Sequence, residues 1–103
     1  MGDVAVQELA VVRVMHLSAE YRLINRLGLH ARAAAQLVQT ANRFKADVTV
    51  VKDNEEVNGK SIMGLLMLAA PVGSQLRVTV SGEDAEEAMQ AIGALIHDGF
   101  GER

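Results

Sequence analysis

The most informative stretch of this chain is Gly28-Leu29-His30-Ala31-Arg32-Ala33-Ala34-Ala35. The residues ahead of it, 20–24, read Glu-Tyr-Arg-Leu-Ile and predict a strand. Behind it, apolar residues recur at helical spacing, at Ala34, Leu37, Val38 and Ala41. A strand, a turn that contains glycine and a helix start therefore place His30 at the entrance of a helix, where free backbone N–H groups point outward.

A helix entrance of this kind is suited to an anion, because its N–H groups carry roughly half a positive charge. The reference pKa of imidazole is about 6.5, so a ring nitrogen is available as a neutral nucleophile near pH 7. These features favour phosphoryl transfer onto His30, with the helix N–H groups and Arg32 holding the phosphoryl oxygens. On these residues alone, a capping or surface histidine remains an alternative.

A second segment, Asn58-Gly59-Lys60-Ser61-Ile62-Met63-Gly64-Leu65-Leu66, adds to the first. The two segments resemble the active-site signature and the regulatory-serine segment of the HPr family. These are the histidine phosphocarriers of the bacterial phosphoenolpyruvate:sugar phosphotransferase system. Leu37-Val38-Gln39-Thr40-Ala41 and Ala46-Asp47-Val48 are also similar, and the resemblance runs from about Glu20 to about Ile96.

The resemblance implies that Nδ1 of His30 carries the phosphoryl group, that Arg32 binds the phosphate and that Ser61 is a regulatory phosphorylation site. It implies a carrier rather than an enzyme, with no cofactor or metal. Enzyme I would be the phosphoryl donor, a histidine of an enzyme IIA component the acceptor, and an HPr serine kinase a further partner. It also implies an apolar docking surface beside the histidine, made of Leu29, Ile62, Met63 and Leu66.

The chain departs from the family at Ala33, where HPr proteins usually have proline. Proline fixes φ and lacks an N–H, which suits a first helical turn, whereas alanine is a strong helix former and should keep the helix. The departure leaves a second interpretation open, an HPr-like regulatory module whose phosphorylation at His30 or Ser61 is read by a kinase or regulator, with little sugar flux. A third is a structural α+β domain in which His30 is inert.

Composition narrows the class of protein. A chain of 103 residues, half of them hydrophobic, predicts one small domain. The sequence has no cysteine, which excludes disulfides and thiolate metal sites, and His16, His30 and His97 lack metal-ligand spacing. A net charge of −3 gives no sign of nucleic-acid binding. No signal peptide or membrane span is visible, so we expect a cytoplasmic chain without membrane insertion.

We expect residues 1–16 to be an extension and residues 17–103 to be an HPr-like domain. After the strand at 20–24, the predicted elements are a helix at 31–44, strands at 47–52 and 55–57, a helix from 62 to about 68 capped by Ser61, a strand at 75–81, and a helix opened by an Asp84/Glu87 capping box and ended by Gly99 and Gly101. This order predicts an α+β two-layer sandwich. The HPr fold is such a sandwich, a four-stranded antiparallel sheet covered on one face by three helices.

The helix that follows Ser61 must bury one side, and we expect Leu65 and Leu68 to form that side. Ile62, Met63 and Leu66 are then left half exposed, as a docking surface with several partners would require. The alternative is that all of these side chains belong to the core.

Overall fold

The computed structural model describes residues 15–102 of the chain. Within these residues one antiparallel sheet, in the order β1-β4-β2-β3, is joined by α-helices α2, α3 and α4 and a short 3-10 helix, η1. The bounds are β1 (Met15–Arg22), α2 (Ala31–Ala41), β2 (Asp47–Lys52), β3 (Glu55–Asn58), α3 (Ile62–Met67), β4 (Gln75–Gly82), α4 (Ala85–His97) and η1 (Gly99–Gly101). The predicted α+β sandwich is confirmed.

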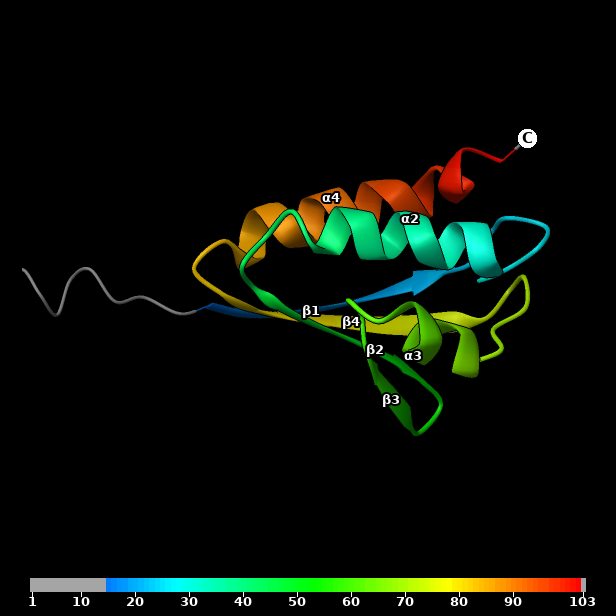
Figure 1. Ribbon diagram of the computed structural model, residues 1–103, viewed down its shortest axis with the longest axis horizontal. Coiled ribbons are helices and arrows are strands. Elements are labelled where there is room, and N and C mark those ends of the chain that lie inside the picture. The colour runs from blue at the N-terminus through cyan, green and yellow to red at the C-terminus, as the bar shows by residue number, and fades with distance from the viewer. Residues whose placement is uncertain (1–14, 103) are drawn as a thin grey trace, which may run out of the picture.

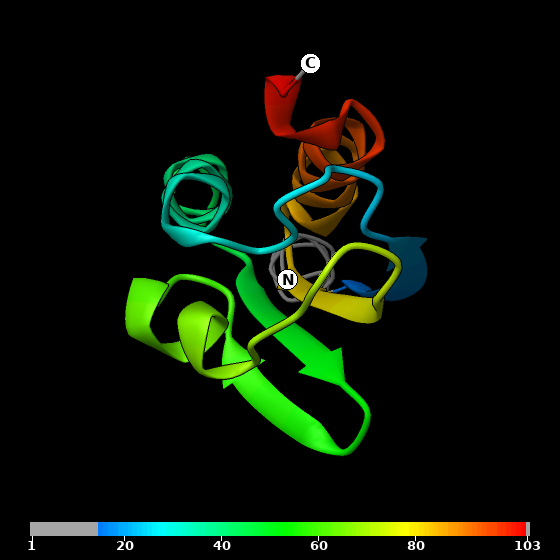
Figure 2. The same ribbon diagram turned by 90° about the vertical axis from the view of Figure 1, so that its right-hand side faces the viewer.

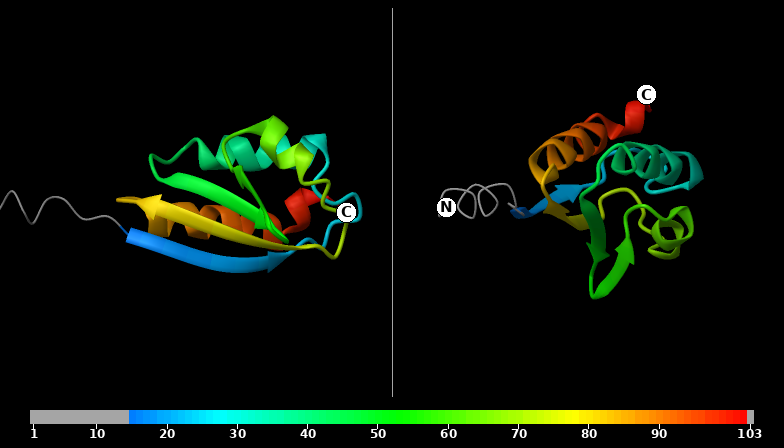
Figure 3. Two further views of the ribbon diagram at one scale, coloured as in Figure 1. Left: turned by 90° about the horizontal axis from the view of Figure 1, so that it is seen from below. Right: turned by 60° about the vertical axis from the view of Figure 1, so that its left-hand side comes forward.

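The helices form a second layer over one face of the sheet. Helices α2 and α4 lie side by side along the strands, and α3 packs against α2 and β3 (Figure 1). The opposite face of the sheet is left uncovered (Figure 3). Buried and exposed residues alternate along β4, which explains why one face of the sheet meets the helices and the other does not. Leu76, Val78 and Val80 are buried, while Gln75 and Arg77 are exposed. None of the described helices has the length and apolar run needed to cross a membrane.

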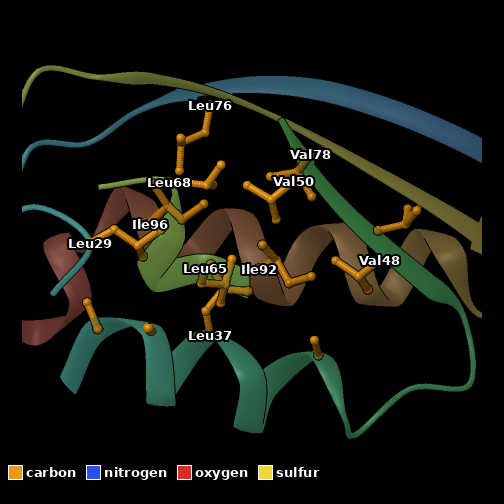
Figure 4. Packing of buried hydrophobic residues seen from close by; sticks show 14 of the residues in the cluster. Leu29, Leu37, Val48, Val50, Leu65, Leu68, Leu76, Val78, Ile92 and Ile96 are labelled. Atoms are coloured by element: carbon orange, nitrogen blue, oxygen red, sulfur yellow. The ribbon is translucent and has the colours of Figure 1, made fainter. Parts of the chain in front are cut away.

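The hydrophobic core fills the space between the two layers. Figure 4 shows labelled side chains from α2, α3, α4, β2 and β4 pointing into this space. Leu37 and Ile92 are fully buried, as the helical spacing predicted, and Ala33 joins them with no exposed surface. Ala33, the position at which the resembled family usually has proline, therefore lies inside the core.

Two predicted elements differ from the structure by more than one residue at an end. Strand β1 runs from Met15 to Arg22, not over 20–24, because it pairs with β4 along its whole length. It ends where the N–H of Leu23 turns to donate to the carbonyl of Ser74 (2.9 Å). Helix α2 ends at Ala41, not at 44, and residues 42–44 form turns. Residues 1–14 of the expected extension lie outside the described residues.

The predicted capping box of α4 is wrong. Asp84 does occupy the N-cap position, but its side chain makes no hydrogen bond to the helix. Its carboxylate instead accepts the N–H groups of Lys45 and Ala46, each at 2.9 Å. These bonds, led by the one from Lys45, lower the pKa of Asp84. The carboxylate thus ties the start of α4 to the connection between α2 and β2.

The loop between β1 and α2 lies against the loop between α3 and β4. The N–H of Leu29 donates to the carbonyl of Ala70 at 2.9 Å, and this contact brings the two loops together at one end of the molecule (Figure 2). Gly28 makes the close approach possible, because it has a φ of +66° and a Cβ there would lie 2.4 Å from the Ala70 carbonyl oxygen.

Gly28→Ala is expected to lower the free energy of unfolding by more than Gly73→Ala. Both glycines have positive φ, so both variants carry the left-handed cost of about 1–2 kcal/mol. A Cβ at Gly73 meets nothing within 4 Å, so only Gly28→Ala adds a clash with backbone. Urea unfolding of the two variants measures the difference. Equal losses of unfolding free energy in the two variants would show that the loop before α2 can move away from the loop before β4 at no cost.

Candidate functional site

His30 lies at the N-cap of α2, as the sequence predicts. Its backbone is extended, with φ −79° and ψ −179°, and its side chain makes no capping hydrogen bond. The first helical bond runs from the N–H of Ala34 to the carbonyl of His30 at 2.8 Å. The N–H groups of Ala31 and Arg32 precede that bond, on two exposed residues, so positive backbone charge faces outward beside the imidazole.

The ring of His30 is held by a carboxylate that the sequence analysis missed. Nε2 of His30 is hydrogen-bonded to Oε2 of Glu102, and the two side chains are 26% and 17% exposed. The other oxygen of Glu102, Oε1, accepts from Nδ2 of Asn25 at 3.2 Å. Asn25 also donates to the carbonyl of Gly28 at 2.7 Å, so one amide group connects the carboxylate to the turn before His30.

The orientation of the Asn25 amide follows from its neighbours. Its Nδ2 faces two acceptors, the carbonyl of Gly28 and Oε1 of Glu102, while its buried Oδ1 has no hydrogen-bond partner within residues 15–102. A flipped amide would set Oδ1 against both acceptors. An unpaired buried oxygen costs about 1–3 kcal/mol, and flipping would lose two bonds as well, so the observed orientation is favoured.

The site keeps the Glu102 carboxyl ionised. The hydrogen bond from His30 is the largest cause that lowers the pKa of Glu102, and partial burial opposes it. The bond from Asn25 and Coulombic interactions with His30 and Arg32 lower this pKa further. Arg32 is an exposed residue in the first turn of α2. The start of α2 therefore brings together the imidazole of His30, the first backbone N–H groups of the helix, Arg32 and the carboxylate of Glu102.

The segment after α4 carries Glu102 to the histidine by three successive left-handed residues. Gly99, Phe100 and Gly101 have φ of 63°, 58° and 72°. The glycines adopt this conformation freely, but for phenylalanine it costs about 1–2 kcal/mol. The phenyl ring is 2% exposed, and burying such a side chain contributes about 1.5–3 kcal/mol, enough to offset the strain. The sequence analysis predicted only that these glycines end the helix.

The second predicted segment forms α3. Oγ of Ser61 accepts the N–H of Gly64 at 3.0 Å, so Ser61 is the N-cap, as predicted. Leu65 and Leu68 are buried at 0% and 2% exposure, whereas Ile62 and Met63 are exposed at 42% and 71%. Met67 is exposed as well and Leu66 is half-buried. We call the set Ile62, Met63, Leu66 and Met67 the α3 apolar surface.

Leu29 does not belong to an exposed docking surface. Its side chain is 4% exposed and forms part of the hydrophobic core, where Figure 4 shows it beside Ile96. The reason is the backbone: the N–H of Leu29 is bonded to Ala70, and this bond holds the residue between the two loops. Leu29 therefore anchors the backbone beside His30 in the hydrophobic core.

Glu102→Gln is expected to make the stability of the protein less dependent on pH. The pKa of Glu102 is lowered from its ordinary value of 4.5, so its carboxylate stabilises the fold above that value. This contribution is lost as the pH falls through the lowered pKa of the folded state. The difference in unfolding free energy between the wild type and the variant should thus be present at pH 7 and close in acid.

Urea titrations between pH 7 and pH 3 measure this difference. Glu86→Gln removes the same charge from the exposed first turn of α4 and serves as the matched control. A difference between the wild type and Glu102→Gln that is constant over the whole range would contradict the bond to His30.

Comparisons with known proteins agree with this geometry. A family model described as "PTS HPr component phosphorylation site" matches residues 17–98. The phosphocarrier protein HPr of Neisseria meningitidis is 50% identical over 86 residues, which cover 84% of this chain and 97% of that protein. The HPr-like protein Crh of Bacillus subtilis is 45% identical over 73 residues, covering 71% of this chain and 86% of Crh.

Solved structures give the same result. The crystal structure of HPr from Thermoanaerobacter tengcongensis matches with a TM-score of 0.82 at 42% identity, covering 84% of this chain and 98% of that one. HPr from Bacillus anthracis matches with a TM-score of 0.76 at 44% identity, covering 79% of this chain and 96% of that one. The name phosphocarrier protein agrees with the prediction of a carrier rather than an enzyme. The chain belongs to the HPr family of phosphocarrier proteins.

Proposed function

We propose that this protein carries a phosphoryl group on Nδ1 of His30 in a cytoplasmic phosphotransferase relay. Phospho-enzyme I, charged from phosphoenolpyruvate, is the donor, and a histidine of an enzyme IIA component is the acceptor in sugar uptake. The observation that carries the proposal is the placement of a partly exposed imidazole at the entrance of α2, beside Arg32 and the exposed N–H groups. Family membership supports the same conclusion.

The shallow geometry suits a carrier. A phosphoryl group on His30 would meet the helix entrance and the exposed Arg32. Contacts with a helix end contribute roughly 0.3–1 kcal/mol at an exposed site, so they stabilise the phosphoryl group without trapping it. In each transfer the bond from phosphorus to the donor nitrogen breaks as the bond to the acceptor nitrogen forms. The group thereby passes from histidine to histidine.

Partner proteins would dock on the α3 apolar surface. Its two methionines are 71% and 67% exposed, and Ile62 is exposed beside them. Helix α3 packs against α2, the helix whose N-cap residue is His30. Methionine adapts to differently shaped partners, which suits a protein that meets a donor and an acceptor in turn.

Regulation through Ser61 is a second candidate function. Ser61 caps the helix that bears the α3 apolar surface, and its side chain is partly accessible. Phosphorylation by an HPr serine kinase would add nearly two negative charges beside apolar side chains, where it would disfavour docking. The similarity to Crh, which is named an HPr-like protein, favours this function. The protein would then act mainly as a module read by a kinase or regulator.

His30→Ala is expected to abolish phosphoryl acceptance while the fold stays intact, because the ring is partly exposed and outside the core. Intact-mass spectrometry after incubation with enzyme I and phosphoenolpyruvate measures one added phosphoryl group, which brief acid treatment removes. His16→Ala, on an exposed position of β1, is the matched control and should keep this group. Acid-labile phosphate on the His30→Ala protein would show that His30 is not the acceptor.

Ser61→Asp is expected to slow phosphoryl transfer from enzyme I about tenfold, the effect of about 1.4 kcal/mol on a barrier. Aspartate also caps helices well, so α3 should persist and the added charge should dominate. Ser61→Ala separates the two effects, since it weakens the cap without adding charge. The rate is followed by quenched-flow phosphorylation, and equal rates for Ser61→Asp and the wild type would exclude docking at this surface.

A further inference from the structure

We infer that Glu102 is a positioning residue for the phosphoryl acceptor: it holds the proton of His30 on Nε2 and so leaves Nδ1 as the nucleophile. This inference rests on the proposed function, and it adds a reason for the choice between the two ring nitrogens. The contact that carries it joins Nε2 of His30 to Oε2 of Glu102.

The direction of the bond follows from the chemistry of the two groups. An ionised carboxylate has no proton and can only accept, whereas a neutral imidazole has one donor nitrogen and one acceptor nitrogen. The pKa of Glu102 is lowered, so the carboxylate is ionised near pH 7. Nε2 of His30 must then donate, and the lone pair of the ring lies on Nδ1.

The carboxylate is held on both of its oxygens. Oε2 meets His30, and Oε1 accepts from Asn25 at 3.2 Å, so rotation of the carboxylate would break two hydrogen bonds at once. The carbonyl of Gly28 accepts both the amide of Asn25 (2.7 Å) and the backbone N–H of His30 (2.9 Å). The backbone of His30 and the partner of its ring are therefore fixed to the same carbonyl group.

The same arrangement balances charge during transfer. As the Nδ1 lone pair forms the bond to phosphorus, the electron pair of the breaking bond returns to the donor nitrogen, and the acceptor ring gains positive charge. The proton stays on Nε2 throughout, and no co-reactant is needed. The Glu102 carboxylate is bonded to this ring and opposes the developing positive charge, whereas Arg32 acts on that carboxylate by lowering its pKa. A carboxylate that orients and stabilises an imidazolium is a known device in histidine chemistry.

Two measurements on Glu102→Ala, Glu102→Gln and the wild type test the inference. ¹⁵N NMR of the ring reports the protonated nitrogen and needs no donor protein, and quenched-flow phosphorylation by enzyme I reports the rate of acceptance. Glu86→Gln, on the exposed first turn of α4, is the matched control for charge and should behave as the wild type in both.

In the wild type we expect a pyrrole-type Nε2 and a pyridine-type Nδ1. In Glu102→Ala, a second population protonated on Nδ1 should appear, and acceptance should slow about tenfold, which corresponds to about 1.4 kcal/mol. Glu102→Gln has no charge and only one acceptor oxygen, so His30 and Asn25 cannot both donate to it. It should therefore also admit a population protonated on Nδ1 and slow acceptance, while unchanged ring signals in Glu86→Gln exclude a general effect of charge.

The outcomes separate this inference from the proposed function. Glu102→Ala with an unchanged tautomer and the rate of the control would overturn the role of Glu102, while the wild type would still accept phosphate. A wild type that accepts no phosphate from active enzyme I would overturn the proposed function. The tautomer measurement would then still decide whether Glu102 positions the ring of His30.

Discussion

One hydrogen bond, from the N–H of Leu29 to the carbonyl of Ala70, holds the end of the molecule on which the site is built. It fixes the loop before α2 against the loop before β4, and only glycine at position 28 lets the two backbones come so close. The start of α2, and with it the ring of His30, takes its place from this contact. Asn25 depends on the same turn, because its amide is bonded to the carbonyl of Gly28.

The polar site is stabilised by apolar burial beneath it. Leu29 directly precedes His30, and Phe100 lies two residues before Glu102. Both Leu29 and Phe100 are core residues. Their burial offsets two local costs, the left-handed backbone of Phe100 and the unpaired Oδ1 of Asn25. Strain of this kind is typical of functional sites and persists only where the surrounding packing determines it. The core thus holds in place the backbone that carries His30 and Glu102.

The parts of the structure that depend on nearby residues could be predicted from the sequence. The alternation in β4, the cap formed by Ser61 and the helix entrance at His30 are local patterns, and the structure confirms them. Two carboxylates could not be placed, because their partners are distant in the sequence. Asp84 suited a capping box but bonds to Lys45 and Ala46, and Glu102 resembled an ordinary residue after a helix. Leu29 was misjudged because a backbone bond, which no side-chain pattern reveals, turns it inward.

The pairing of β1 has a consequence for the order in which the protein is made. Strand β1 lies at an edge of the sheet, and its partner β4 begins only at Gln75, so β1 stays without a partner strand while residues 23–74 are synthesised. Glu102 emerges from the ribosome later still. A nascent chain therefore displays His30 long before the carboxylate arrives, and the site is complete only after translation has passed Glu102.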